Sequence, residues 1–185
     1  MNKYCLPAAS ILWALSCGLA QAVELIIGEA RIEPGVVVIF EGAVRDHVIP
    51  QAQHLAEDDT DVHIEARVNW DSENIPAGTP AGGFVPYLHI HARVSNANTG
   101  KSLLVTLTPH LNLIDNFHYA RNITLPGAKD DPYTVEFFVN PPDSFVLAKH
   151  RDWQSGYGEK VFEPQTFLYE NVDFLSIVDA PPRAQ

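Results

Sequence analysis

The feature that most constrains the fold is residues 61–70, a segment in which polar and apolar side chains alternate without a break. Successive side chains of a β-strand point to opposite faces of a sheet, so this period of two predicts a strand with one face in a core. His63 and Glu65 share its polar face, because residues i and i+2 point the same way. An imidazole beside a carboxylate can bind a divalent transition metal, although solvated faces of sheets also carry such pairs.

Further segments show the same alternation and are separated by Pro, Gly and Asn-rich turns. They are residues 24–27, 36–40, 86–95, 103–108, 133–140 and 165–177. Pro109 is expected to end its strand, since proline cannot donate to a ladder. The polar segment 41–60 is expected to be a surface connection, with His47 and His54 as solvated loop residues. No segment has helical periodicity over three turns. The chain is therefore predicted to be all-β, an immunoglobulin-like antiparallel β-sandwich in a single domain.

The N-terminal segment, residues 1–22, has a basic start, a short apolar run and Ala-Gln-Ala at its end. This pattern predicts a secretory signal peptide rather than a membrane anchor, and residues 23–185 are then the folded domain. Cys17 has a weak resemblance to a lipoprotein processing site, but ordinary cleavage after Ala22 is favoured. Cys5 and Cys17 both lie in the excised segment, so a metal in the exported protein must be held by nitrogen and oxygen.

The charge of the exported chain is strongly negative: the full sequence has a net charge of −11, and removal of Lys3, the one charged residue of the signal peptide, takes it to −12. Such a surface disfavours nucleic acid and anionic membranes and favours cations. All eight histidines remain after cleavage. No nucleophile elbow, phosphate loop or HExxH motif is present. Histidine and carboxylate side chains from several strands could instead converge on one face, and imidazoles suit copper, iron and zinc.

Several segments together resemble a known family. They are DVHIEA, FVPYLHIHARVSN, TPHLNLIDNFHYARNI, YTVEFFVNPP and KHRD. The chain resembles the periplasmic ferrous-iron transport protein family, small exported proteins that accompany a high-affinity iron permease of the bacterial inner membrane. The resemblance implies an immunoglobulin-like homodimer with a copper- and iron-binding site close to the dimer interface.

The resemblance also assigns ligands. His63 and Glu65 match the histidine and acid of the family's strand motif, and His118 matches the histidine of its DxxHY motif. His150 matches a histidine that the partner protomer contributes. His110 stands after a proline, where the family has a methionine, so imidazole replaces thioether in this reading. Thioether is the softer ligand, and weaker selectivity for Cu(I) is expected here.

The leading hypothesis is a periplasmic metal-binding protein, not an enzyme, that binds Fe(II) and Cu(II) and delivers iron to an inner-membrane permease. Its expected partners are a second copy of itself and the permease, through which alone it meets the membrane; no nucleic acid is expected. A metalloenzyme is the alternative, because His89 and His91 on one strand resemble copper-zinc superoxide dismutase. These two histidines otherwise face solvent or form a second site. A third reading is an adhesion or assembly module with incidental histidines.

Overall fold

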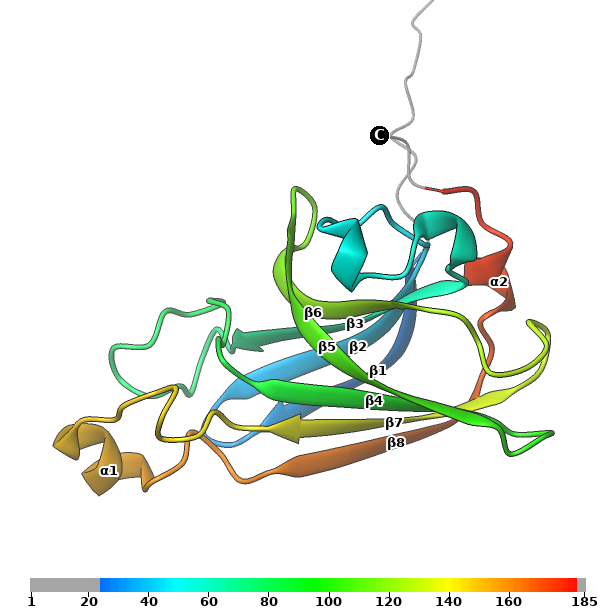
Figure 1. Ribbon diagram of the computed structural model, residues 1–185. Coiled ribbons are helices and arrows are strands. Elements are labelled where there is room, and N and C mark those ends of the chain that lie inside the picture. Colours follow the sequence, from blue (N-terminus) through cyan, green and yellow to red (C-terminus); the bar gives the residue numbers. More distant parts are fainter. Residues whose placement is uncertain (1–23, 183–185) are drawn as a thin grey trace, which may run out of the picture.

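Eight antiparallel strands form the framework of the chain between residues 24 and 182, the part that the computed structural model describes (Figure 1). The strands are β1 (Glu24–Ile32), β2 (Val36–Ala43), β3 (Val62–Trp70), β4 (His89–Asn96), β5 (Ser102–Asn112), β6 (Asn116–Ile123), β7 (Tyr133–Asn140) and β8 (Gln165–Val172). Short helices are η1 (Gln51–Gln53), η2 (Glu57–Asp59), α1 (Arg151–Tyr157) and α2 (Leu175–Val178). None of the helices in this part of the chain is long and apolar enough to cross a membrane. The predicted all-β class is confirmed; the predicted signal peptide lies outside the described residues.

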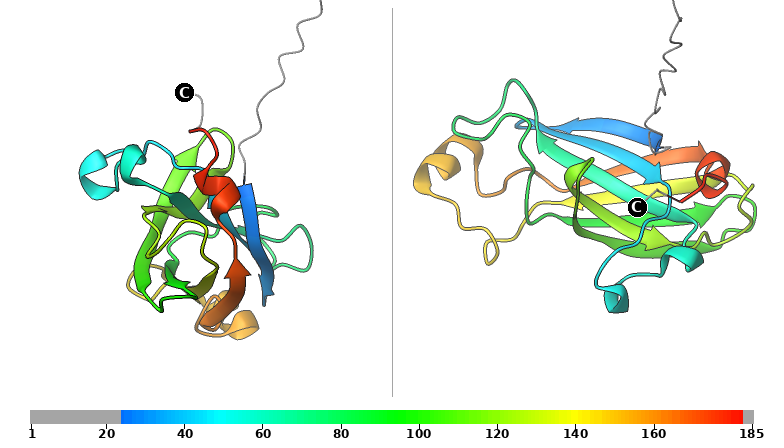
Figure 2. Two further views of the ribbon diagram at one scale, coloured as in Figure 1. Left: turned by 90° about the vertical axis from the view of Figure 1, so that its right-hand side faces the viewer. Right: turned by 90° about the horizontal axis from the view of Figure 1, so that it is seen from above.

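The strands follow the order β1-β2-β3-β6-β5-β4-β7-β8 in one sheet that curls until it is nearly closed (Figure 2). Strand β5 joins the two halves of this sheet, because residues 102–107 pair with β4 and residues 108–112 pair with β6. The prediction that Pro109 ends the strand was wrong. From residue 108 onward β5 pairs on one side only, and proline is tolerated in such edge positions.

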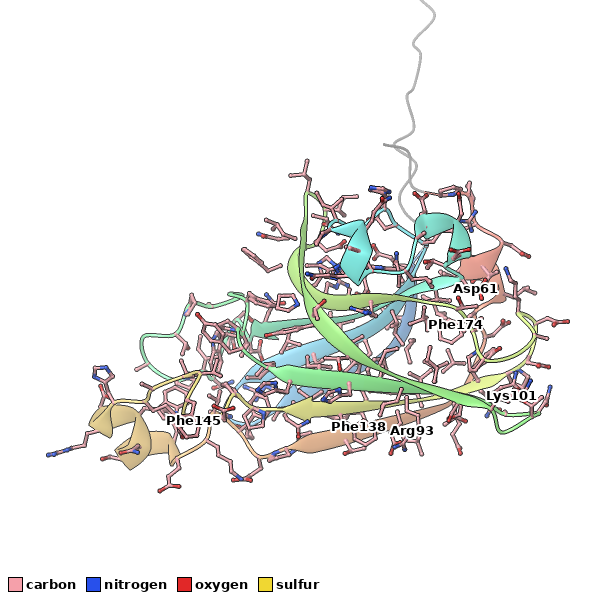
Figure 3. All side chains as sticks on the ribbon, viewed as in Figure 1. Asp61, Arg93, Lys101, Phe138, Phe145 and Phe174 are labelled. Carbon is pink, nitrogen blue, oxygen red and sulfur yellow. The ribbon has the colours of Figure 1, made fainter. Side chains whose placement is uncertain are left out.

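The core lies between the two halves of the sheet and is filled by alternate side chains of the strands. The rings of Phe40 and Phe137 stack with centroids 4.1 Å apart, and Ile64 is fully buried in the same core cluster. Burying each such side chain stabilises the fold by about 1.5–3 kcal/mol. On the outer face, Arg93 lies over the ring of Phe138, 5.1 Å from its centroid (Figure 3).

The edges of the curled sheet meet where β1 passes β8. A Cβ atom added at Gly28 would lie 2.0 Å from Cε1 of Tyr169, so any side chain here would displace the Tyr169 ring. The pairing of β1 with β2 shifts register between Ile26 and Gly28, which bends the edge strand at this point. Gly28 thus leaves room for the Tyr169 ring of β8 between the two edges.

The connection between β2 and β3, residues 44–60, carries η1 and η2 and covers the outer face of the sheet beside β3 and β6 (Figures 1 and 2). The buried side chain of Asn122 holds it in place. Its Nδ2 donates to the carbonyl oxygens of Asp46 at 2.9 Å and Leu55 at 3.0 Å. The predicted surface connection is therefore a fixed cover, called the covering loop below.

Other predicted boundaries also changed. The region after Pro109, which lacks a steady period, contains the end of β5 and all of β6. The last strand ends at Val172 rather than near residue 177, and α2 follows it, while α1 lies inside the connection 144–164. The sheet is continuous rather than divided into two separate sheets, and the immunoglobulin-like arrangement stays a prediction.

Candidate metal centre

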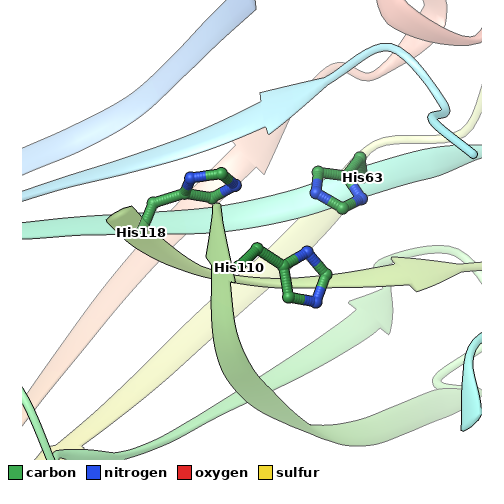
Figure 4. Close-up of side chains that lie close together, drawn as sticks. All are labelled: His63, His110 and His118. Atoms are coloured by element: carbon green, nitrogen blue, oxygen red, sulfur yellow. The ribbon is translucent and has the colours of Figure 1, made fainter. Parts of the chain in front are cut away.

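Three neighbouring strands bring histidines from distant parts of the sequence to one place on the outer face. His110 of β5 lies directly opposite His118 of β6 in the antiparallel register. His63 of β3 lies opposite Asn122, and Glu65 lies opposite Ala120, on the other side of β6. The outward positions of β6 therefore lie between His63 on β3 and His110 on β5, and the three imidazoles gather there (Figure 4).

The spacing of the three imidazoles suits a single ion. One ligand nitrogen from each of His63, His110 and His118 lies within 4.8 Å of the other two. Ring centroids are 5.3 Å apart for His63 and His110, 5.8 Å for His110 and His118, and 6.2 Å for His63 and His118. The carboxylate Oε1 of Glu65 lies 3.7 Å from Nε2 of His63. Three nitrogens and an adjacent carboxylate oxygen form a donor set that fits Cu(II), Fe(II) or Zn(II).

Hydrogen bonds fix which nitrogen of two of these imidazoles carries the proton. Both hydrogens of the Asn122 amide are donated to backbone carbonyls, so its Oδ1 is the acceptor facing Nδ1 of His63 at 2.6 Å. Nδ1 of His63 therefore carries the hydrogen. Nδ1 of His118 likewise donates to the carbonyl oxygen of Asn116 at 3.0 Å. Both imidazoles consequently keep the lone pair on Nε2, the atom that would bind a metal.

Burial keeps the His110 imidazole neutral. His63, Glu65 and His118 are between 1% and 3% exposed. Burial, together with the neighbouring His63 and His118, lowers the pKa of His110 to about 3. A neutral imidazole is the form that binds a metal, so His110 needs no deprotonation at neutral pH.

An ion pair lies beside the histidines on the same outer face. Glu41, opposite Glu65 in the register, is 1% exposed. Its carboxylate accepts a hydrogen bond from Nη2 of Arg67 at 2.6 Å, and its other oxygen lies 2.6 Å from Nε of Arg67 in an ion pair. Burial raises the pKa of Glu41, and the Arg67 guanidinium offsets this only in part. Arg67 thus balances one of two adjacent buried carboxylates.

A pocket of about 470 Å³ opens over the three histidines. The covering loop lines its other side with His47 and His54, which sequence reasoning had placed in solvent. His47 is exposed, whereas the His54 ring packs against the His110 ring with centroids 5.1 Å apart. Burial, together with the positive charge of Arg121, lowers the pKa of His54. The sequence shows two histidines in the connection that precedes β3, but it does not show that this connection lies over the three clustered histidines.

The remaining predicted histidines lie elsewhere in the chain. His150 is the N-cap of α1 and lines a different pocket, beside Trp70 and Trp153, so the single chain does not bring it to the other predicted ligands. His89 and His91 lie on β4, in the other half of the sheet. Nδ1 of His91 is hydrogen-bonded to Oγ1 of Thr106 at 3.0 Å, and Nε2 of His89, which is half exposed, lies 4.0 Å from Oδ2 of Asp143.

A curled antiparallel sheet with a buried cluster of imidazoles on its outer face defines a class: an all-β protein with a nitrogen- and oxygen-rich site for a transition metal. The chain belongs to the family described as Fe2+ transport protein, which it matches over residues 21–175.

Relatives and solved structures agree with this assignment. The chain is 30% identical over 141 residues to the 34 kDa membrane antigen of Treponema pallidum (strain Nichols), covering 75% of this chain and 68% of that protein. It is similar to a copper-bound methionine-to-isoleucine variant of P19 from Campylobacter jejuni, with a TM-score of 0.69, 28% identity and coverage of 80% and 96%. A copper-bound glutamate-to-glutamine variant of FetP from uropathogenic Escherichia coli strain F11 gives a TM-score of 0.65, 25% identity and coverage of 80% and 95%.

Proposed function

We propose that the protein is a periplasmic metal-binding protein of high-affinity iron uptake, which binds Fe(II) and Cu(II) and delivers iron to an inner-membrane permease. One observation carries the proposal: in a chain of the Fe2+ transport family, ligand nitrogens of His63, His110 and His118 lie within 4.8 Å of one another beside a buried carboxylate. The net charge of −11 supports it, because an acidic surface raises the local concentration of cations.

The donor set favours borderline metals over soft ones. Copper is bound by the P19 and FetP structures that resemble this chain. His110, opposite His118, offers imidazole where the family resemblance expects a thioether. Imidazole and carboxylate suit Fe(II) and Cu(II), whereas sulfur ligands favour Cu(I). We therefore expect copper binding here to be less selective for Cu(I) than in relatives with methionine at this position, which competition under reducing and oxidising conditions measures.

A homodimer is part of the proposal. His150 is exposed at the start of α1 and lines a pocket of its own, so a second copy would have to supply it to the ligand cluster. Exposed apolar side chains at the histidine pocket and on the adjoining turn between β5 and β6 support an interface there. Ile49 and Leu111 line the pocket, and Leu113 and Ile114 lie on the turn. Replacing His150 by alanine in the dimer should then weaken metal binding, and unchanged affinity would contradict the shared site.

The enzymatic alternative has less support. His89 and His91, the pair that resembles superoxide dismutase, lie on β4 and contact Asp143 and Thr106 rather than the three clustered histidines. The family description and the similar solved proteins concern transport and copper binding rather than catalysis. Superoxide-dismuting activity of the copper-loaded protein would reopen this alternative.

Metal titration tests the proposal. The exported protein should bind Cu(II), and Fe(II) under anaerobic conditions, and a metal at 100 times its dissociation constant should raise the free energy of unfolding by about 2.7 kcal/mol. The double variant His63→Ala/His118→Ala should lose this stabilisation, whereas His91→Ala, on β4, should keep it. Equal binding by the double variant and the wild-type protein would contradict the proposed site.

A further inference from the structure

The covering loop places a fourth imidazole at the mouth of the histidine pocket. The rings of His54 and His110 meet edge to face with centroids 5.1 Å apart, about the same separation as His63 and His110 at 5.3 Å. Two imidazoles that share one tetrahedral ion, with metal–nitrogen bonds of about 2.0–2.1 Å, have ring centroids about 5 Å apart. His110 therefore has two neighbours at a distance that suits a shared ion, one on each side.

His54 is held there by the fold. Asn122 binds the backbone of the covering loop at Asp46 and Leu55, on both sides of the segment that contains η1. The His54 backbone N–H closes η1 by donating to the carbonyl oxygen of Gln51. Loop position and ligand orientation are linked, because the same Asn122 side chain also accepts the hydrogen bond from His63.

The His54 side chain has an unsatisfied nitrogen. Its Nδ1 is buried and makes no hydrogen bond within residues 24–182. Buried polar atoms in folded proteins nearly always have a partner, and one without a partner calls for an explanation, such as a bound ion. Asp46 and the exposed His47 line the same pocket, so the pocket also contains oxygen and nitrogen donors of the covering loop.

We propose that His54 and His110 form an outer position for a divalent transition cation at the mouth of the pocket. An ion bound there reaches the inner position by exchanging His54 for His63 and His118, while His110 remains bound throughout. This inference rests on the proposed function, since it assumes that the inner histidines bind a metal. It adds a route by which the ion enters a site whose inner ligands are almost fully buried.

Cobalt(II) absorption can test the two positions separately. The variant His63→Ala/His118→Ala removes the inner position, and it should still bind Co(II) more weakly through the outer one. Adding His54→Ala to that variant should abolish the remaining binding. In the otherwise unchanged protein, His54→Ala should slow Co(II) uptake by about tenfold or more, a size of effect usual for the loss of a group beside a metal site. The dissociation constant should change less than about threefold, because His54 is not a ligand of the inner position.

The possible results lead to different conclusions. His91→Ala is the matched control, because His91 lies on β4 bonded to Thr106, and it should bind Co(II) at the wild-type rate. Wild-type uptake by His54→Ala, or no Co(II) binding in the folded inner-site variant, would overturn the outer position. A dissociation constant that rises as much as the uptake rate falls would make His54 a permanent ligand and would also overturn the proposal. Wild-type affinity in the inner-site variant would instead contradict the proposed function.

Discussion

Replacing Asn122 by alanine removes three hydrogen bonds from beneath the covering loop. The amide oxygen accepts from His63 at 2.6 Å, and the amide nitrogen donates to the carbonyl oxygens of Asp46 at 2.9 Å and Leu55 at 3.0 Å. Each contributes about 0.5–1.5 kcal/mol, so the free energy of unfolding of the metal-free protein should fall by about 1.5–4.5 kcal/mol. His63 also loses the acceptor that fixes its proton on Nδ1, and metal affinity should fall about 10–100-fold.

Asn122→Asp separates these two effects. Aspartate keeps an acceptor for His63 but cannot donate to the two loop carbonyls. We expect Asn122→Asp to lose stability while its Cu(II) affinity stays closer to wild type than that of Asn122→Ala. Urea denaturation of the metal-free proteins and Cu(II) competition against a chelator measure the two quantities. Wild-type Cu(II) affinity in Asn122→Ala would refute the reasoning about the His63 proton, and wild-type stability in Asn122→Asp would refute the anchoring of the loop.

Three further predictions concern charge and specificity. The pKa of His110 is lowered from its usual 6.5 to about 3, so in that range the unfolded chain binds a proton that the folded chain does not. The free energy of unfolding should therefore fall as the pH drops from about 6.5 towards 3. His110→Gln should make this fall shallower when urea denaturation is repeated across that pH range. The same dependence of stability on pH in the variant and the wild-type protein would contradict the burial of His110. Glu41→Gln leaves the Arg67 guanidinium without its carboxylate and should reduce the free energy of unfolding by about 2–4 kcal/mol. This loss is smaller than for a fully buried ion pair, because Arg67 is partly exposed. Denaturation of the metal-free variant measures the loss, and a change below about 0.5 kcal/mol would refute the prediction. Replacing His89 and His91 together by alanine should leave Cu(II) stoichiometry and affinity unchanged in the same competition assay, and the loss of one bound ion would reveal a second site there.

The strands and the inward faces were predictable because they depend on local alternation. Val62 to Trp70 reads as an amphipathic strand, and the structure buries its apolar face in the core. The end of β5 was not predictable, because Pro109 is tolerated only where the strand changes partners, and strand pairing is not a local property. Once β5 continues past Pro109, His110 lies opposite His118.

The candidate site was predictable only in part. His63 and Glu65 were identified as neighbours on one face, but their burial, at 3% and 2% exposed, was not predicted, nor was the covering loop that lines the pocket beside His63. That loop is fixed by Asn122, a residue of β6 far away in sequence, so nothing in the composition of the loop indicates its position. His54 was assigned to solvent for the same reason. Its role becomes visible only when the loop is placed over His110.

A crystal structure of the exported protein soaked in copper, with anomalous scattering to locate the ion, tests the central claim most directly. We predict one strong peak about 2.0–2.1 Å from Nε2 of His63 and Nε2 of His118, with His110 also bound. A copper ion found only at other residues, with these three imidazoles unchanged and none within bonding distance of it, would contradict the account.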